Sequence, residues 1–357
     1  MISLKTATKN CFTNEQIKEL IGKHFPESEL ETITSLSGGT FNTLYEIKGS
    51  GELSNGVILK TGPNESIVVP SHEQSILQTE VYAYIMLADK ELPVPQIYAY
   101  DFSKEDIPCD YFIMKKIEGK TWFDYWPIKD SRLMRELGRY TAALHSVDKK
   151  WFGYMRWDKT GRFDKWGEAF IFMIDEVLNS AEQHGMKLPF KKIQNIIEER
   201  REMLNELKSP SLVNFDMWAG NIFVKKEPHY SISGFIDFER SFMGDPLASF
   251  SSALLLYNNV EKEKEFLAGY NEVSREPLVI TDADREKMVM YELLMYLRAY
   301  SEIHRYGFWF GLVQRVVIRL IITELMSKLK RFKKKRLKKS EHKRQEVSEV
   351  KSQRKAV

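Results

Sequence analysis

The sequence predicts an α+β protein with two lobes: a small N-terminal lobe built on an antiparallel sheet, and a larger lobe made mostly of helices. Short β-type runs separated by turn residues, with one main helix among them, occupy the first third of the chain. Apolar residues at helical spacing dominate the rest. A length of 357 residues suits two domains or one two-lobed unit, and 43% hydrophobic residues allow a sizeable core. We place the lobes at residues 1–115 and 116–327, followed by a basic tail at 328–357.

The charge of the chain is unevenly distributed. The tail carries 14 lysines and arginines against 3 acidic residues, whereas the rest of the chain carries 39 against 47. A basic run with little apolar content predicts disorder, and attachment to RNA or to an acidic membrane is the alternative. Cys11 and Cys109 fit neither a disulfide framework nor a metal-ligand spacing. Without an apolar leader or a run of ~20 apolar residues, we expect a cytoplasmic protein with no membrane span.

The N-terminal lobe begins with a helix at 13–25, whose Thr13 and Gln16 have the spacing of a capping box. Strands follow at 31–36 and 43–47. The segment that joins them is rich in glycine, which lets backbone N–H groups approach a phosphate, although for this segment by itself an ordinary hairpin turn is the favoured explanation. The candidate phosphate-binding residues of this segment are Ser37, Gly38, Gly39 and Thr40.

The next strand, at 57–60, ends in Lys60. Antiparallel pairing with the preceding strand places Lys60 near Leu44, where its ammonium can reach the phosphates of a nucleotide. A solvated lysine at a strand end is the alternative. In the amphipathic helix at 73–87, Glu80 is the candidate ion-pair partner of Lys60, and Glu73 is its rival.

The lobe boundary is predicted just after a strand at 111–114. Met114 ends that strand, and packing in the core explains it as well as contact with a ligand does. Seven helices are expected beyond it. His145, near the end of the first of them, is interpreted as a structural residue satisfied in the core. These helices cover 133–147, 168–184, 191–207, 250–257, 262–270, 284–306 and 311–329.

The chemistry is concentrated between Leu212 and Arg240. Two short β-type runs around Pro228 predict a hairpin that brings Asn221 level with Asp237 at its open end. A carboxylate and an amide oxygen suit Mg²⁺. Asp216 lies five residues before Asn221, which is the spacing of a kinase catalytic loop, where the aspartate receives the substrate's hydroxyl proton. Turn capping explains an isolated match of this kind, but unpaired charges beside apolar residues are costly, and a metal would offset that cost.

This stretch resembles the aminoglycoside phosphotransferase and choline-kinase-like family of small-molecule kinases. That family has H-G-D-x-x-x-x-N followed by I-D-[FW], and this chain has Asp216, Asn221 and then Ile236-Asp237-Phe238. Asn214 and Phe215 replace the usual His and Gly. A later Gly-Asp-Pro turn also matches, and we assign its Asp245 a loop-bracing role.

The resemblance implies a protein-kinase-like fold that binds MgATP or MgGTP between its lobes. Lys60, held by Glu80, would contact the α- and β-phosphates. The backbone near Lys116 would contact the adenine edge, with Met114 packing beside the ring. Asn221 and Asp237 would hold Mg²⁺, and Asp216 would act as the catalytic base.

The acceptor implied by the resemblance is a small hydroxylated molecule. An aminoglycoside or another antibiotic comes first, which would mean a role in antibiotic resistance, and choline, a sugar or another amino alcohol comes second. The acidic body favours a cationic acceptor, which Glu239, Glu292 or Glu302 could contact. Two alternatives remain: a catalytically silent nucleotide-binding protein of this fold, and a nucleic-acid-binding protein that acts through its tail.

Overall fold

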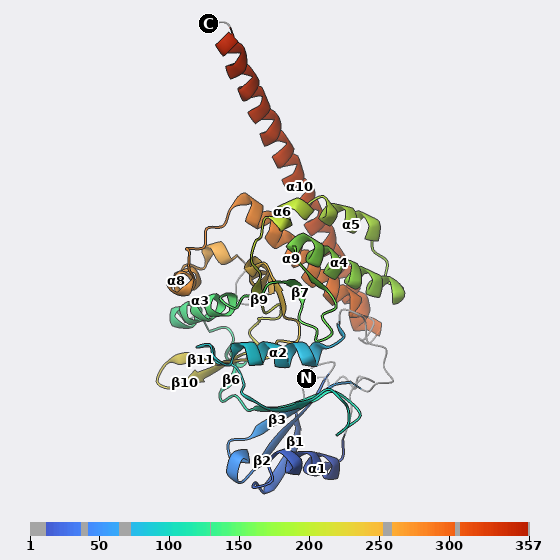
Figure 1. Cartoon of the computed structure of the whole chain (residues 1–357), viewed down its shortest axis with the longest axis vertical. Helices are drawn as coiled ribbons and strands as arrows, with labels where there is room; N and C mark the ends of the chain where they lie inside the picture. The colour runs from blue at the N-terminus through green and yellow to red at the C-terminus, as the bar shows by residue number, and fades with distance from the viewer. Residues whose placement is uncertain are drawn as a thin grey trace.

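The computed structural model describes residues 12–36, 42–63, 73–128, 130–252, 259–303 and 308–355, with the backbone alone for 308–310 and 339–355. Figure 1 shows a small β lobe joined to a larger, mostly helical lobe, from which one long helix projects. The predicted two-lobed α+β architecture is therefore confirmed.

The N-terminal lobe is a five-stranded antiparallel sheet with the strand order β1-β2-β3-β5-β4. Lys60 pairs with Leu44, as the sequence predicts. Helix α1 (Asn14–His24) covers one face, and its capping box is present. Helix α2 (Ile76–Leu87) packs on the other face, between the sheet and the larger lobe (Figure 1). The strands are β1 (Leu30–Leu36), β2 (Thr43–Gly49), β3 (Val57–Thr61), β4 (Ile97–Asp101) and β5 (Tyr111–Lys115).

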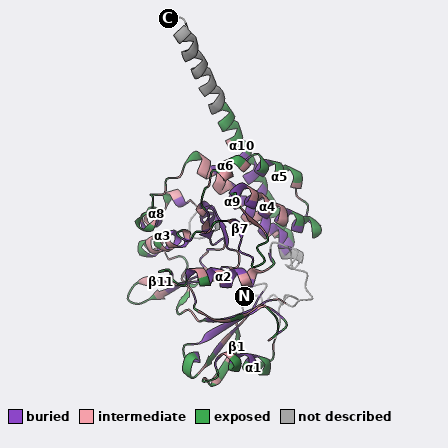
Figure 2. Ribbon diagram, in the orientation of Figure 1, coloured by how far each residue is buried: buried purple, intermediate pink, exposed green. Residues whose placement is uncertain are grey.

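The larger lobe surrounds a core that also reaches the α2 face of the sheet, and its buried residues gather where its helices meet (Figure 2). Its helices are α3 (Ser131–His145), α4 (Trp166–Gln183), α5 (Phe190–Glu198), α6 (Arg201–Asn205), α7 (Ser249–Ser252), α8 (Lys264–Val273), α9 (Asp282–Ser301) and α10 (Phe308–Lys355). The helix expected at 191–207 is thus two helices, α5 and α6. The 3-10 helices are η1 (Gly51–Leu53), η3 (Trp122–Tyr125), η4 (Pro246–Ala248) and η6 (Val260–Lys262).

Two small antiparallel sheets carry the loops that form the cleft, with the strand orders β11-β10-β6 and β8-β7-β12-β9. Their strands are β6 (Lys120–Thr121), β7 (Phe152–Tyr154), β8 (Arg162–Phe163), β9 (Ser211–Val213), β10 (Ile222–Lys226), β11 (Tyr230–Phe235) and β12 (Phe242–Gly244). The hairpin β10–β11 is present, but its register differs from the prediction. Ile222 pairs with Phe235, and the carbonyl of Asn221 accepts from the N–H of Ile236 at 3.0 Å. The hairpin closes about Pro228, with Lys226 paired to Tyr230, and this centre alone would set Ile222 opposite Gly234. A bulge at Ser233 moves Ile222 one residue along, to Phe235, which brings the register nearer to the predicted one.

Helix α10 does not end near Leu329, so the predicted disorder of 328–357 is not what the described backbone shows up to Lys355. Lys, Arg, Gln and Glu are strong helix formers, so a tail rich in them can extend a helix already fixed by the core. Arg200 fixes the part of α10 near Leu329, because its guanidinium donates to the carbonyl of Leu329 at 2.7 Å and to Glu286 at 2.8 Å. Binding of the tail to RNA or to an acidic membrane remains a prediction. Among the described residues, none of the helices combines the length and apolarity needed to cross a bilayer.

Helices α3 and α8 pack closely through two glycines. A Cβ built on Gly138 would lie 2.1 Å from the carbonyl oxygen of Phe266, and one on Gly269 would lie 1.8 Å from that of Arg135. We expect Gly138→Ala to lower the free energy of unfolding by about 1–3 kcal/mol, because the backbones must separate. Chemical denaturation measures this change. The control is Gly22→Ala in α1, where nothing lies within 4 Å, and where alanine should instead add about 0.5–1 kcal/mol. Equal effects at the two positions would contradict the packing argument.

Candidate active site

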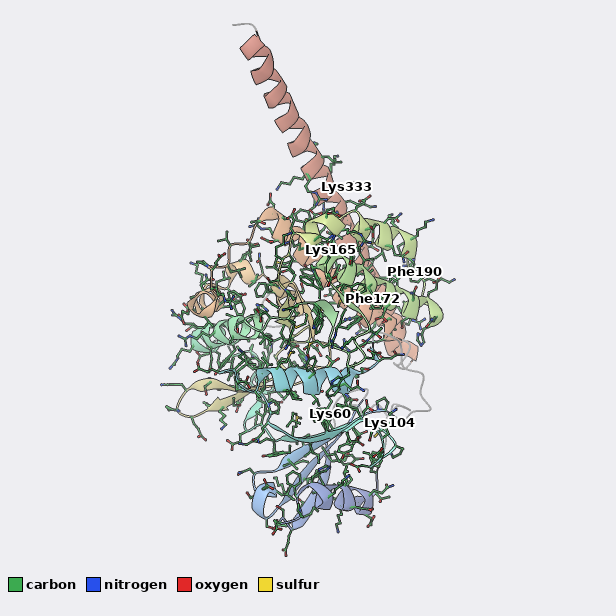
Figure 3. The ribbon with its side chains drawn as sticks, in the orientation of Figure 1. Lys60, Lys104, Lys165, Phe172, Phe190 and Lys333 are labelled. Carbon is green, nitrogen blue, oxygen red and sulfur yellow. The ribbon has the colours of Figure 1, made fainter. Side chains whose placement is uncertain are left out.

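A cavity of about 860 Å³ lies between the two lobes. Lys60 enters it from the sheet of the N-terminal lobe, on the side that faces the larger lobe (Figure 3). Every predicted site residue that the structure describes lines this cavity. These residues are Lys60, Glu80, Met114, Lys116, Asp216, Asn221 and Asp237. The remaining predicted residues, Ser37, Gly38, Gly39 and Thr40, lie outside the described residues.

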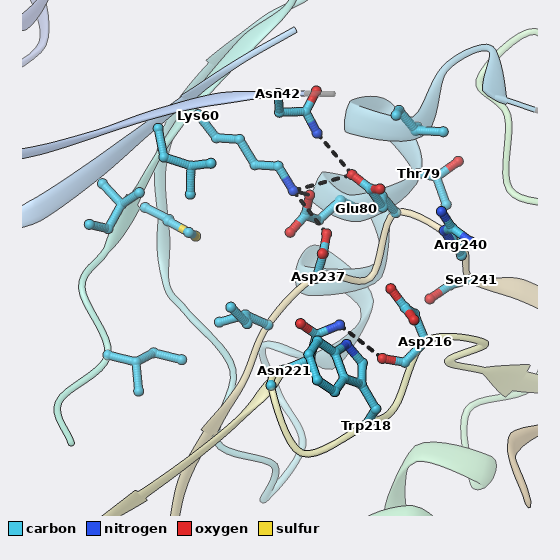
Figure 4. A pocket seen from close by; sticks show the side chains of 18 of the residues that line it. Asn42, Lys60, Thr79, Glu80, Asp216, Trp218, Asn221, Asp237, Arg240 and Ser241 are labelled. Carbon is cyan, nitrogen blue, oxygen red and sulfur yellow. Dashed lines mark hydrogen bonds and ion pairs between the residues drawn. The ribbon is translucent and has the colours of Figure 1, made fainter. Parts of the chain in front are cut away.

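Lys60 is the centre of a buried ion-pair cluster (Figure 4). Its Nζ lies 2.6 Å from Glu80 Oε2, 3.0 Å from Asp237 Oδ1 and 3.3 Å from Glu239 Oε2. The predicted pair with Glu80 is therefore present, and the rival Glu73 is not the partner of Lys60 in this cluster. Glu239 is a member that sequence reasoning did not place there, and Asn42 Nδ2 also donates to it at 2.9 Å.

The charges of this cluster are strongly coupled. Burial alone would lower the pKa of Lys60, but Asp237, Glu80 and Glu239 outweigh it and hold that pKa well above its ordinary value. Burial likewise opposes ionisation of Asp237, yet Lys60 prevails and lowers the pKa of that carboxyl. Burial and the negative Asp237 raise the pKa of Glu239 to about 8. Lys60 and Asp237 are thus ionised at neutral pH, and Glu239 keeps its proton.

Tyr84 connects α2 to the loop that carries Asp237. Its hydroxyl donates to Glu80 Oε1 at 2.8 Å and accepts from the N–H of Asp237 at 3.1 Å. Asp237 itself has a φ of 64°, a left-handed conformation that is uncommon for residues other than glycine. The hydrogen bond from its own N–H helps to hold the carboxylate toward Lys60 in spite of this strain.

Asp216 lies in the loop between β9 and β10. Asn214 Oδ1 accepts from the Asp216 N–H at 2.9 Å, and the Asp216 carbonyl accepts from Asn221 Nδ2 at 2.9 Å. Asn214, which stands where the family usually has His, therefore braces this loop directly. Burial raises the pKa of Asp216 to about 6, although the nearby Arg240 opposes the rise. The carboxylate is still the main form above neutral pH.

The oxygen groups of the cleft fit a magnesium ion. Asp237 offers a carboxylate, and the hydrogen bond made by Asn221 Nδ2 leaves the oxygen of that side chain as a further ligand. Oxygens of Glu80, Asp237 and Glu239 lie within 4.8 Å of one another. Because Glu239 keeps its proton, the carboxylates of Glu80 and Asp237 share a single ammonium, and the negative charge that remains is one a divalent cation can balance. The donor set therefore fits Mg²⁺, with Asn221 and Asp237 as its predicted ligands.

The segment at the lobe boundary, from Met114 to Lys116, differs from its prediction in one respect. Met114 is buried and belongs to the core that reaches across both lobes, as well as to the cavity wall. The backbone N–H of Lys116 donates to the carbonyl of Gly56 at 3.3 Å, so it is not free to donate to an adenine edge. The Lys116 side chain instead binds Glu46 Oε1 at 2.6 Å, at the cavity wall.

Two further features of the cleft were not predicted from the sequence. Arg240 Nη2 lies 3.1 Å from Glu302 Oε2, which joins the loop after Asp237 to the end of α9. The rings of Phe123 and Trp218, 5.8 Å apart, form an aromatic part of the wall. Arginine and glutamate immediately beside an I-D-F motif are visible in the sequence, but their partners lie far away along the chain, so local spacing could not identify them.

Asp245 and His145 take the structural positions that were predicted. Asp245 accepts from the N–H of Leu247 at 3.0 Å and from the hydroxyl of Tyr291 at 2.8 Å, so it braces its loop. The ring nitrogens of His145 contact the hydroxyls of Tyr270 and Ser249, each at 2.9 Å. With both nitrogens engaged in this way, His145 is a structural residue.

The neutral state of His145 predicts a pH-dependent stability. Burial lowers its pKa to about 3, whereas the unfolded chain protonates near its ordinary value of about 6.5. Because the unfolded state then binds the extra proton, stability falls as the pH drops. We expect wild type to lose about 2 kcal/mol more than His145→Gln between roughly pH 7 and pH 5. Denaturation at both pH values measures this difference, and the two proteins share every other titrating group. Parallel losses would show that the folded protein does not hold His145 neutral.

On one side of the cleft a lysine is held by a glutamate from a helix, and on the other side lie an Asp, an Asn and a second Asp. This arrangement defines the class of kinase-like phosphotransferases. The profile of the Phosphotransferase enzyme family matches residues 32–288. The chain belongs to this family, and it is a small-molecule phosphotransferase. A comparison with curated proteins gives no significant match.

Solved structures confirm the fold at low sequence identity. A putative aminoglycoside phosphotransferase from Ralstonia eutropha JMP134 has a TM-score of 0.62 and 14% identity, covering 90% of this chain and 99% of its own. A putative fructosamine-3-kinase from Thermobifida fusca YX-ER1 has a TM-score of 0.63 and 15% identity, covering 86% and 98%. A thermostable mutant of aminoglycoside phosphotransferase APH(4)-Ia has a TM-score of 0.61 and 16% identity, covering 88% and 99%.

Proposed function

We propose that this protein transfers the γ-phosphate of ATP or GTP to a hydroxyl of a small molecule bound in the interlobe cleft. The observation that carries the proposal is the meeting, in one cavity, of the Lys60–Glu80 ion pair with Asp216, Asn221 and Asp237. A similar structure of the APH(4)-Ia mutant, with a TM-score of 0.59, is a ternary complex with AMP-PNP and hygromycin B. That complex supports a nucleotide and an acceptor together in a cleft of this kind.

The chain's own residues have distinct parts in this reaction. Lys60, kept charged by its carboxylate neighbours, binds the phosphates of the nucleotide. Asn221 and Asp237 would hold Mg²⁺, which when bound supplies positive charge beside the phosphates. The acceptor oxygen forms a bond to the γ-phosphorus while the bond from phosphorus to the bridging oxygen breaks, and the nucleoside diphosphate leaves. Asp216 orients the acceptor hydroxyl and receives its proton.

The first candidate acceptor is an aminoglycoside or another hydroxylated antibiotic, in line with two of the similar structures. A sugar, choline or another amino alcohol is the second, and the fructosamine-3-kinase likeness supports the sugar class. The acidic residues expected to contact amines are mostly engaged within the protein. Glu239 binds Lys60 and Glu302 binds Arg240, while Glu292 is not among the residues that line the cavity.

The test is phosphate transfer from ATP and GTP, with and without Mg²⁺, to a panel of aminoglycosides, other antibiotics, choline, ethanolamine and sugars. We expect transfer that needs Mg²⁺ and one acceptor class. Nucleotide binding without transfer to any acceptor, and without ATP hydrolysis, would favour a catalytically silent protein of this fold instead.

A further inference from the structure

Four residues that line the cavity carry a buried polar atom that makes no well-formed hydrogen bond with the described residues. Asn42 Oδ1 is an acceptor beside the Lys60 cluster. The other three are donors: the Nε of Arg298 and the hydroxyls of Tyr154 and Ser241. Arg298, Tyr154 and Ser241 are only 4%, 6% and 2% exposed, respectively. An unpaired buried polar group costs about 1–3 kcal/mol, so three in one cavity indicate a ligand that pairs with them.

The small sheet of the larger lobe brings two of these groups to the catalytic loop. Tyr154 on β7 pairs with Phe242 on β12, and Ser241 immediately precedes Phe242. On its other side Phe242 pairs with Val213 of β9, the strand that leads into the loop of Asp216. Figure 4 shows Ser241 beside Asp216. Both hydroxyls therefore lie on the side of the cavity where Asp216 meets the acceptor.

Arg298 reaches the same place from α9. Its guanidinium carbon lies 5.2 Å from the ring centroid of Phe215, the residue before Asp216. Burial raises the pKa of Tyr154 to about 12, and both the charge of Arg298 and its side-chain contact with the Tyr154 hydroxyl oppose that rise.

The ion pairs of the neighbouring arginines set Arg298 apart. Arg156 lies 2.9 Å from Glu176 and Arg240 lies 3.1 Å from Glu302, whereas Arg298 forms no ion pair with a carboxylate of the described residues. Arg298 is thus a buried cation whose counter-ion is to be supplied by something else.

We infer that the acceptor carries an anionic oxygen group, a carboxylate or a phosphate, which binds to Arg298, Tyr154 and Ser241 while its hydroxyl meets Asp216. The inference rests on the proposed function, because it takes this side of the cleft as the acceptor site. All three groups can donate hydrogen bonds to oxygen, and a guanidinium matches the geometry of carboxylate and phosphate. An anion here would satisfy the three unpaired groups at once.

The competing arrangement is an amine bound by the acidic residues of the same cavity. Glu302 is already bound by Arg240, and Glu73 lies near enough to help raise the pKa of Arg240, after the larger effect of Glu302. An acceptor amine would have to share these carboxylates with Arg240, and it would leave Arg298 without a counter-ion. The described charges therefore favour an anionic group over the amines of an aminoglycoside.

A matched set of probes tests this preference. Gluconate, glucose 6-phosphate, glucose and glucosamine are similar in size and hydroxyl content but carry a carboxylate, a phosphate, no charge and an amine. Their binding to the full chain is measured by calorimetry at constant ionic strength, with AMP-PNP and Mg²⁺ present. We expect one of the anionic probes to bind about 10- to 100-fold more tightly than glucose, as one charge-assisted contact predicts. Which of the two binds more tightly separates carboxylate from phosphate.

Two sets of variants assign that preference to these residues. Arg298→Met should abolish it and Arg298→Lys should restore part of it, while the control Arg285→Met, on the exposed surface of the same helix, should leave it intact. The double replacement of Tyr154 by Phe and Ser241 by Ala should weaken anion binding while changing the free energy of unfolding little, because neither hydroxyl makes a well-formed hydrogen bond with the described residues. The double variant keeps the test valid if Arg298→Met does not fold.

The outcomes separate the inference from the proposed function. The inference is overturned if the four probes bind equally, or if none of them binds. It is also overturned if glucosamine binds most tightly, or if the preference for an anionic probe survives Arg298→Met. The proposed function fails instead if no acceptor of any charge receives phosphate. Transfer to neutral or cationic acceptors alone would preserve the function and overturn the anionic site.

Discussion

Replacing Asp216 by Asn is expected to lower the rate of phosphate transfer by about 10²–10⁴ while nucleotide binding changes little. An amide has nearly the same shape as the carboxylate, but it cannot receive the proton of the acceptor hydroxyl, and general-base catalysis contributes a factor of this size. The backbone contacts of Asp216 with Asn214 and Asn221 do not involve its carboxylate, so the loop should stay in place. Steady-state transfer and calorimetric binding of AMP-PNP measure the two effects.

The matched control for this variant is Asp124→Asn. Asp124 also lines the cavity, but its carboxylate accepts hydrogen bonds from Thr121 at the start of a 3-10 helix. We expect its replacement to change transfer only a few-fold. Unchanged turnover in Asp216→Asn, or an equal loss in both variants, would remove Asp216 from the role of base.

Replacing Lys60 by Met should both abolish transfer and destabilise the fold. Methionine approximates the length of lysine but leaves Glu80, Asp237 and Glu239 without their shared cation, at a site where Lys60 is 5% exposed. Removing one partner of a buried ion pair costs about 3–5 kcal/mol. We expect a decrease of that order in the free energy of unfolding, measured by chemical denaturation. Mg²⁺ should recover part of it, since a cation would again balance the carboxylates.

Lys116→Met is the control for the stability of the Lys60 variant. Lys116 lies at the lobe boundary and pairs with Glu46 of the N-terminal lobe at 2.6 Å, but its side chain is 36% exposed. A pair in contact with water contributes about 0–1 kcal/mol, so the expected loss is much smaller. Similar losses at the two lysines, or an effect of Mg²⁺ on both, would contradict the buried cluster.

Local patterns were sufficient for the parts of the site that depend on spacing and strand pairing. The pairing of Lys60 with Leu44 follows from two adjacent strands, and the position of Glu80 follows from one helix packed on them. The spacing of Asp216 and Asn221 needs only a single loop, and the hydrogen bond between them holds its two ends together. Each of these predictions involves neighbours along the chain or along one sheet.

The features that sequence reasoning missed depend on contacts between distant segments. The bulge near Ser233 depends on packing that alternation of side chains does not encode. Arg240 is bound by a glutamate from a helix 62 residues further on. Arg298 gave no signal, because an arginine in an amphipathic helix is ordinarily a surface residue. The helical tail was not predicted, because the composition of 328–357 does not encode the buried contacts that hold α10 at Leu329.

The left-handed backbone of Asp237 bears on how this protein can change over generations. A strained residue and three crowded carboxylates are both costs to folding, and the cleft keeps them for reasons other than stability. Many substitutions at this point would relax the chain and disable the chemistry together. Selection for stability and selection for catalysis therefore oppose each other at this site. A descendant no longer selected for catalysis would readily gain stability and lose activity.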